Sequence, residues 1–165
     1  MTIRPSDPAA VVCTPLAVER AALAGVLPSL PVLRTGKGPA RSLTSAGRAE
    51  VRDRPLAVAG LAGAVTDDLR PGDLVVATEL RTGSSVPKSL PAAPLVAGAL
   101  RRAGLPVRLG PIRSTDRIVH GAARAGLAAD GVVAVDMEST QLAGAAGRHP
   151  VLVLRAVVDT PRHPL

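Results

Sequence analysis

The chain has 165 residues, of which 47% are hydrophobic and none is Phe, Trp or Tyr. This length suits one domain with a substantial core, and the apolar content excludes disorder over most of the chain. The formal net charge is +7, yet no basic run exceeds two residues and no aromatic residue can stack on a base, so nucleic-acid binding is not expected.

Apolar runs that alternate with helical patterns predict an α/β fold. Residues 1–8 are expected to be a loose lead-in, followed by a single domain over residues 9–165. Strands are predicted over residues 9–14, 31–35, 55–59, 74–78, 106–112, 132–135 and 151–158. Helices are predicted over residues 16–23, 92–103, 120–129 and 141–146, and loops over residues 60–64 and 79–91. Because the strands are continuous apolar runs, the sheet should be covered on both faces.

Two glycine-rich segments follow predicted strands. In the first, Lys37 stands between Gly36 and Gly38, which lets the backbone approach an anion, although an ordinary turn fits equally well. Its spacing is not that of a Walker loop. The second, over residues 60–64, consists of small residues and offers another place where a ligand could meet backbone amides.

Acidic residues stand at the ends of two predicted strands. Asp136 and Glu138, with Met137 between them, follow the strand over residues 132–135, and Asp159 follows the last strand. Ligands in open α/β sheets bind at the carboxyl ends of strands, but such residues also cap helices, so the local pattern leaves both interpretations open. Glu19 likewise fits a solvated acid near a helix start.

The remaining features concern the single cysteine and the location of the protein in the cell. The single cysteine, Cys13, ends an apolar run and is expected to be a buried small hydrophobe, with a nucleophilic role the alternative. No apolar run is long enough to span a membrane, and no signal peptide is recognisable, which predicts a cytoplasmic protein with no membrane span.

In the order of its motifs, the chain resembles the nucleoside phosphorylase family, which includes purine nucleoside and uridine phosphorylases and the methylthioadenosine/adenosylhomocysteine nucleosidases. The resemblance covers about residues 9 to 161 and is closest to the hopanoid-associated phosphorylases. It implies a three-layer fold, with a central mixed, mostly parallel sheet flanked by helices on both faces. The motifs that carry it are residues 35–38, 59–64 with 69–76, 134–139 and 154–159.

The resemblance also implies an activity, namely cleavage of the N-ribosidic bond of a purine nucleoside. Phosphorolysis is expected, with adenosylhopane as a candidate substrate, inorganic phosphate as co-substrate and no cofactor or metal. The partners expected are the nucleoside, phosphate and further copies of the chain, as a dimer, trimer or hexamer. The alternatives are a hydrolytic nucleosidase of the methylthioadenosine/adenosylhomocysteine or futalosine type, a non-catalytic nucleoside-binding protein, and an unrelated α/β protein whose turns are only caps.

The roles implied by the resemblance are assigned position by position. Met137 and Glu138 would bind the ribose, Asp159 would protonate or hydrogen-bond the leaving base, and Glu19 matches the acid that activates water in the nucleosidases. The residues expected near phosphate or the nucleophile are Gly36, Lys37, Gly38, Gly60, Ala62 and Gly63. Arg41, Arg81 and Arg155 would contact phosphate or form ion pairs.

Two departures from the family pattern concern the base. Asp116 and Ile118 fall in the base region, but no aromatic residue follows there, so binding of the base would rest on aliphatic contacts or on a partner subunit. The family also continues past the last strand into a helix that covers the site. The domain over residues 9–165 is expected to lack this helix, which would leave Asp159 poorly shielded.

Overall fold

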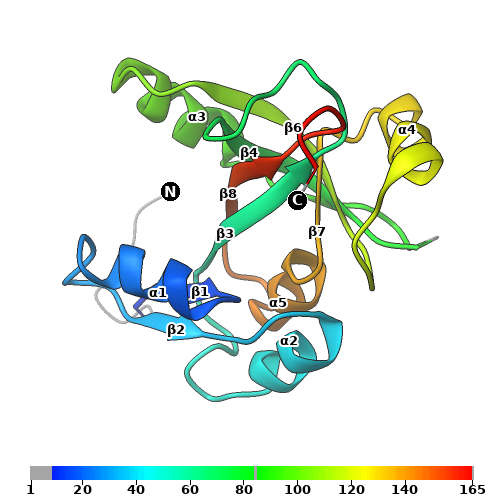
Figure 1. The fold of residues 1–165 in the computed structure, drawn as a ribbon. Helices are drawn as coiled ribbons and strands as arrows, with labels where there is room; N and C mark the ends of the chain where they lie inside the picture. The colour runs from blue at the N-terminus through cyan, green and yellow to red at the C-terminus, as the bar shows by residue number, and fades with distance from the viewer. Residues whose placement is uncertain (1–8, 84, 165) are drawn as a thin grey trace.

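A computed structural model describes residues 9–83 and 85–164 (Figure 1). The predicted lead-in over residues 1–8 lies outside these residues. The strands are β1 (Val11–Thr14), β2 (Val32–Arg34), β3 (Leu56–Ala64), β4 (Leu74–Arg81), β5 (Lys88–Ser89), β6 (Val107–Ser114), β7 (Ala134–Asp136) and β8 (Val151–Asp159). The helices are α1 (Ala17–Ala24), α2 (Pro39–Ala46), α3 (Ala93–Arg102), α4 (Gly121–Ala129) and α5 (Ser139–Ala145). The predicted alternation of strands and helices is confirmed.

The described residues form one eight-stranded sheet in the order β2-β1-β3-β7-β6-β4-β5, with β8 between β3 and β4. The pairs of β1 with β2 and β3, of β8 with β3, and of β6 with β4 and β7 are parallel. β7 also pairs antiparallel with the end of β3, so five strands close into a ring. Irregularities after Ala62 and Ala77 supply the bends that such closure needs. The sheet is mixed and mostly parallel, as expected.

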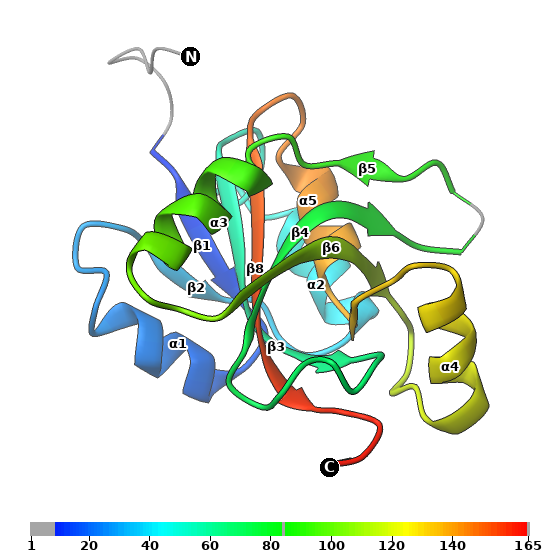
Figure 2. The same cartoon turned by 90° about the horizontal axis from the view of Figure 1, so that it is seen from above.

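Helices cover both faces of this sheet (Figures 1 and 2). α3 packs over Val76, Leu152 and Leu154, whereas the large core cluster on the opposite face contains Val153 and Leu142 of α5. Neighbouring residues of one strand point to opposite faces, which is why β8 serves both layers. α2 lies against α5 in the outer layer. The three-layer arrangement is therefore confirmed.

Two local predictions were wrong, and one helix was not predicted. The segment over residues 60–64 was expected to be a loop, but it continues β3, because β8 pairs with it along its length. The segment over residues 79–91 is not all loop, since β4 runs to Arg81 and β5 follows it. Helix α2 was not predicted, because a proline and two glycines lie at its start. Proline is well accommodated in the first turn of a helix.

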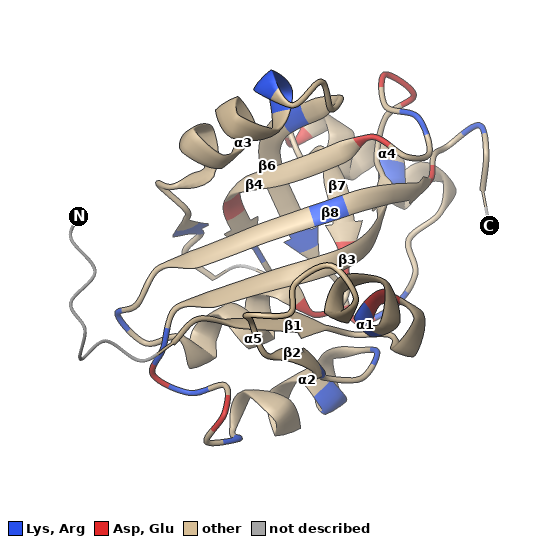
Figure 3. Cartoon of the chain, turned by 90° about the vertical axis from the view of Figure 1, so that its left-hand side faces the viewer, with Lys and Arg blue, Asp and Glu red and all other residues tan. Residues whose placement is uncertain are grey.

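Charged residues are largely excluded from the middle of the strands, and Figure 3 shows one blue segment interrupting β8. This segment is Arg155, whose side chain is completely buried. A buried guanidinium requires partners of opposite charge. Its partners lie at the candidate site, so β8 is both a central strand and the support of that site.

Candidate active site

A cavity of about 450 Å³ opens at the carboxyl ends of β1, β6, β7 and β8 and along the last residues of β3. Strand ends of an α/β sheet are where ligand sites are expected. Eight residues predicted for the site line it: Glu19, Lys37, Ala62, Gly63, Ile118, Met137, Glu138 and Asp159. The fold therefore brings together residues from six separate parts of the sequence.

Glu138 is held in place by the glycine-rich loop. The Gly38 amide donates a hydrogen bond of 2.8 Å to Glu138 Oε1, and Gly38 adopts a φ of +90°, which favours glycine. Burial raises the pKa of the Glu138 carboxyl, while the Gly38 amide and the Arg155 guanidinium act in the opposite direction. The Gly38 amide therefore orients Glu138, the residue predicted to bind the ribose.

Asp136 and Arg155 form a buried ion pair beneath this carboxylate. Arg155 Nη2 lies 2.6 Å from Asp136 Oδ2, 2.9 Å from Ser139 Oγ and 3.8 Å from Glu138 Oε2. Asp136 also accepts a hydrogen bond of 2.6 Å from Ser114 Oγ. These contacts give Asp136 a supporting role and assign Arg155 to an ion pair that also reaches Glu138.

Glu19 is not a solvated acid, since only 8% of it is exposed. Its carboxylate accepts hydrogen bonds from the amides of Leu16, at 2.6 Å, and Leu61, at 2.8 Å. A Cβ placed on Gly60 would lie 2.6 Å from Glu19 Oε1 and 2.8 Å from Arg155 Nη1. The absence of a side chain at Gly60 therefore lets an acid and a guanidinium approach the same point.

The buried end of this guanidinium has unused donors. Nε and Nη1 of Arg155 have no hydrogen-bond partner within the described part of the chain. Both atoms are buried and Arg155 does not line the cavity, so they are not exposed to a ligand there. The Glu19 carboxylate does line the cavity and can accept a proton or a hydrogen bond from a ligand there.

Asp159 is well shielded, contrary to the expectation from the sequence. It is 5% exposed and pairs with Arg124 of α4, whose Nη2 lies 2.6 Å from Asp159 Oδ2. A Cβ on Gly63 would lie 2.5 Å from Arg124 Nη2 and 2.7 Å from Asp159 Oδ1, so this contact also needs a glycine. The sequence analysis missed Arg124, although it is the one charged residue in α4.

Other predicted residues lie away from the cavity. Arg81 pairs with Glu79 and donates to the Asp130 carbonyl at 2.7 Å. Asp116 is exposed and does not line the cavity, although its neighbours on both sides do. Gly36 and Arg41 line a second cavity. The lining of the first cavity therefore includes the aliphatic side chain of Ile118 together with Arg124 and Asp159.

Burial raises the pKa of the Cys13 thiol to about 12, so the thiol stays protonated, in keeping with the predicted small hydrophobe. Among residues 9–83 and 85–164, no three His, Cys, Asp or Glu side chains gather in a metal-binding arrangement. In the same ranges, no helix has the length and apolarity needed to cross a membrane.

A closed, mixed α/β sheet with buried acids around a cavity at its strand ends is the architecture of a small-molecule enzyme. Residues 22–164 match the family model described as the phosphorylase superfamily, so the chain belongs to this superfamily. No curated protein sequence matches the chain.

Solved structures share the fold at low sequence identity. The 5′-methylthioadenosine/S-adenosylhomocysteine nucleosidase of Helicobacter pylori has a TM-score of 0.79 at 17% identity, and the alignment covers 93% of this chain and 86% of that one. The S-adenosylhomocysteine nucleosidase of Streptococcus pyogenes has a TM-score of 0.80 at 19% identity, and the alignment covers 96% of this chain and 87% of that one. The futalosine hydrolase of Helicobacter pylori has a TM-score of 0.78 at 16% identity, and the alignment covers 92% of this chain and 84% of that one.

Proposed function

We propose that this protein hydrolyses the N-ribosidic bond of a purine nucleoside, releasing the base and a free sugar. The observation that carries the proposal is Glu19, a buried carboxylate that lines the cavity and is held by the amides of Leu16 and Leu61. A water molecule in the cavity would donate a hydrogen bond to this carboxylate, which can then take the water's proton as a general base. The structural similarity to proteins named as nucleosidases and a futalosine hydrolase supports the same reaction class.

The ribose lies over Glu138 and Met137. Glu138 Oε1 already accepts the Gly38 amide, and Oε2 accepts a long bond of 3.4 Å from Met137 N. A carboxylate has about four acceptor positions, so it can also take bonds from two sugar hydroxyls. The Met137 side chain supplies apolar contact to the ring.

The leaving base lies beside Asp159. Negative charge develops on the purine as the bond to C1′ breaks, and Asp159, which enters the reaction protonated, donates its proton to N7 and stabilises that charge. Arg124 Nη2, 2.6 Å from Asp159 Oδ2, stabilises the carboxylate that remains once the proton has left. Water loses one proton to Glu19 and the purine gains one, so the reaction consumes one water and leaves no net charge.

Glu19 favours water over phosphate as the nucleophile. Its carboxylate occupies the Leu61 amide, one of the backbone donors that a phosphate oxygen would otherwise use. It would also repel a phosphate dianion at close range. Phosphorolysis is the second candidate, because Lys37 lines the same cavity and could partly offset this repulsion.

The test is release of adenine from a purine nucleoside in phosphate-free buffer and in buffer with phosphate. We expect release at the same rate in both, and a loss of about 10²–10⁴-fold in Glu19→Gln, the range for a general base. Glu50→Gln, at an exposed position, is the matched control. Release only with phosphate would support phosphorolysis, and no turnover of any purine nucleoside would support a binding protein.

The group at the 5′ position of the nucleoside is a separate question. Adenosine, methylthioadenosine and adenosylhopane share the adenine and ribose that Asp159 and Glu138 would contact. They differ in the 5′ substituent, so their relative kcat/KM values measure how the chain treats that group alone. Adenosylhopane stays a prediction from the motif resemblance.

A further inference from the structure

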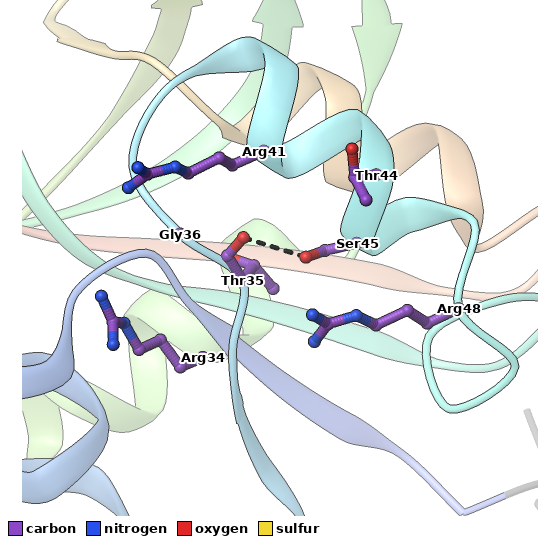
Figure 4. A pocket seen from close by; sticks show the side chains of 7 residues that line it. All are labelled: Arg34, Thr35, Gly36, Arg41, Thr44, Ser45 and Arg48. Atoms are coloured by element: carbon purple, nitrogen blue, oxygen red, sulfur yellow. Dashed lines mark hydrogen bonds between the residues drawn. The ribbon is translucent and has the colours of Figure 1, made fainter.

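We propose that the second cavity, between the end of β2 and helix α2, binds a small anion of the phosphate or pyrophosphate class. This cavity has a volume of about 440 Å³ and is lined by the side chains of three arginines, Arg34, Arg41 and Arg48. Figure 4 shows their guanidinium groups distributed around Thr35 and Gly36. The proposed site is separate from the active-site cavity.

The arginine cluster arises only in the folded chain. The sequence places the three residues seven positions apart, with no basic run. Arg41 lies in α2, and Arg48 follows within a continuing helical turn, marked by its amide bond to the Ser45 carbonyl at 3.0 Å. Two turns of helix bring residues seven apart back to one face. Arg34 ends β2, which runs directly into the loop before α2.

The cluster carries positive charge that the described residues do not neutralise. All three arginines are exposed, and none takes part in an ion pair formed within residues 9–83 and 85–164. By contrast, Arg124 and Arg155 each lie 2.6 Å from a carboxylate. Like charges gathered around one cavity repel each other, and a bound anion converts that repulsion into attraction. Guanidinium groups match the geometry of phosphate oxygens.

Two contacts fix the loop and the Arg41 side chain at this cavity. Ser45 Oγ donates a hydrogen bond of 2.9 Å to the Thr35 carbonyl, which ties α2 to the loop (Figure 4). Gly36 has a φ of +87°, and a Cβ there would lie 2.9 Å from Arg41 Cδ. Glycine at this position therefore leaves room for the Arg41 side chain, which lies against the backbone there.

The loop over residues 36–38 separates the two cavities. Lys37 lines the active-site cavity and Gly38 holds Glu138, whereas Gly36 belongs to the arginine cavity. From the sequence, Gly36 and Lys37 were expected near phosphate, and Arg41 in a phosphate contact or an ion pair. The fold instead places Lys37 on one side of the loop, with Gly36 and Arg41 on the other.

The experiment is a calorimetric titration with inorganic phosphate and with pyrophosphate at low ionic strength, which measures binding without any need for catalysis. We expect both to bind, pyrophosphate more tightly, and added salt to weaken the binding. Arg34→Gln with Arg41→Gln should weaken it by about tenfold or more, because two charge-assisted contacts are lost. Arg70→Gln with Arg102→Gln, at exposed positions elsewhere, removes the same charge and should leave affinity within about twofold.

Three results would overturn the proposal. The first is that neither anion binds the wild-type protein. The second is that the two double variants lose affinity for the anions equally. The third is that Lys37→Gln loses affinity while the double variant of Arg34 and Arg41 still binds. The last result would place the anion in the active-site cavity. Amide chemical shifts of the wild-type protein give a reading that requires no variant. Pyrophosphate should shift Gly36 and Thr44 more than Gly63, and the reverse order also refutes the proposal.

Discussion

Arg155→Met should be the most destabilising single change at the site. The substitution fills a similar volume but leaves Asp136 buried without its cation, 2.6 Å from where the guanidinium stood, and it removes a positive charge from beside Glu138. Removing one partner of a buried ion pair costs about 3–5 kcal/mol. A domain of this size has a free energy of unfolding of about 5–15 kcal/mol, so the variant would be marginally stable.

Urea unfolding followed by far-ultraviolet circular dichroism measures this loss, since a chain without Trp or Tyr gives no usable intrinsic fluorescence. With a urea dependence of about 2 kcal/mol per molar, the midpoint should fall by about 2 M. Arg102→Met, at an exposed position in α3, is the control and should shift it little.

A second substitution identifies the cause of the loss. In the Arg155→Met background, Asp136→Asn removes the stranded charge and should restore part of the lost stability, whereas the same change in the wild-type protein should be destabilising. A loss below about 1 kcal/mol for Arg155→Met, as expected for a surface pair, would refute the reasoning. So would equal costs for Asp136→Asn in both backgrounds.

Three further predictions concern the cavity. Gly60→Ala puts a methyl group 2.6 Å from Glu19 Oε1 and should abolish base release in a steady-state assay. The control is Gly110→Ala, whose methyl group would lie 2.5 Å from a side-chain carbon of Val133, and which should lower stability but spare activity per folded molecule. Equal activity in the two variants would contradict this. Asp159→Asn should lower kcat by about 10²–10⁴-fold, and an unchanged kcat would exclude it as the acid. Burial raises the pKa of Glu138 in the folded protein above 4.5, its ordinary value. Between pH 4.5 and the folded pKa, the native protein holds a proton that the unfolded chain has lost. The free energy of unfolding therefore falls as the pH rises through this range. In urea titrations, Glu138→Gln should therefore gain stability relative to the wild type from pH 4.5 towards neutrality, and a constant difference would contradict this.

The strand ends could be predicted from the sequence because their signals are local. The apolar run of β8 ends in Asp159, and the short run of β7 ends before Glu138, so each acid is placed by the strand before it. The principle that ligands bind at strand ends then brings the two acids to one region. The structure places both of them on the same cavity, as this principle requires.

The contacts between distant segments could not be predicted from local patterns. Gly60 and Gly63 resembled a loop, but they lie in β3, where a missing Cβ makes room for buried charged side chains. Glycine inside a strand often marks such close approach, although the partner is not visible in the sequence. Arg124, in a helix of small residues, gave no signal until β8 placed Asp159 beside it.

The arginine cavity illustrates the same limitation for surface charge. Net charge and the length of basic runs detect clusters along the sequence, and the arginines of this chain form none. Arg34 and Arg41 are brought together by the turn from β2 into α2, a helix that the proline at its start had obscured. A charge pattern read at helical spacing would have detected Arg41 and Arg48 once α2 was known.

The most direct test of the central claim, that a water molecule activated by Glu19 attacks the nucleoside, is the identity of the sugar product. The reaction is run with a purine nucleoside in heavy-oxygen water with phosphate present, and the product is analysed promptly by mass spectrometry. The account predicts a free sugar that carries one oxygen from the solvent, and no sugar 1-phosphate. A sugar 1-phosphate without solvent oxygen at C1′ would contradict it.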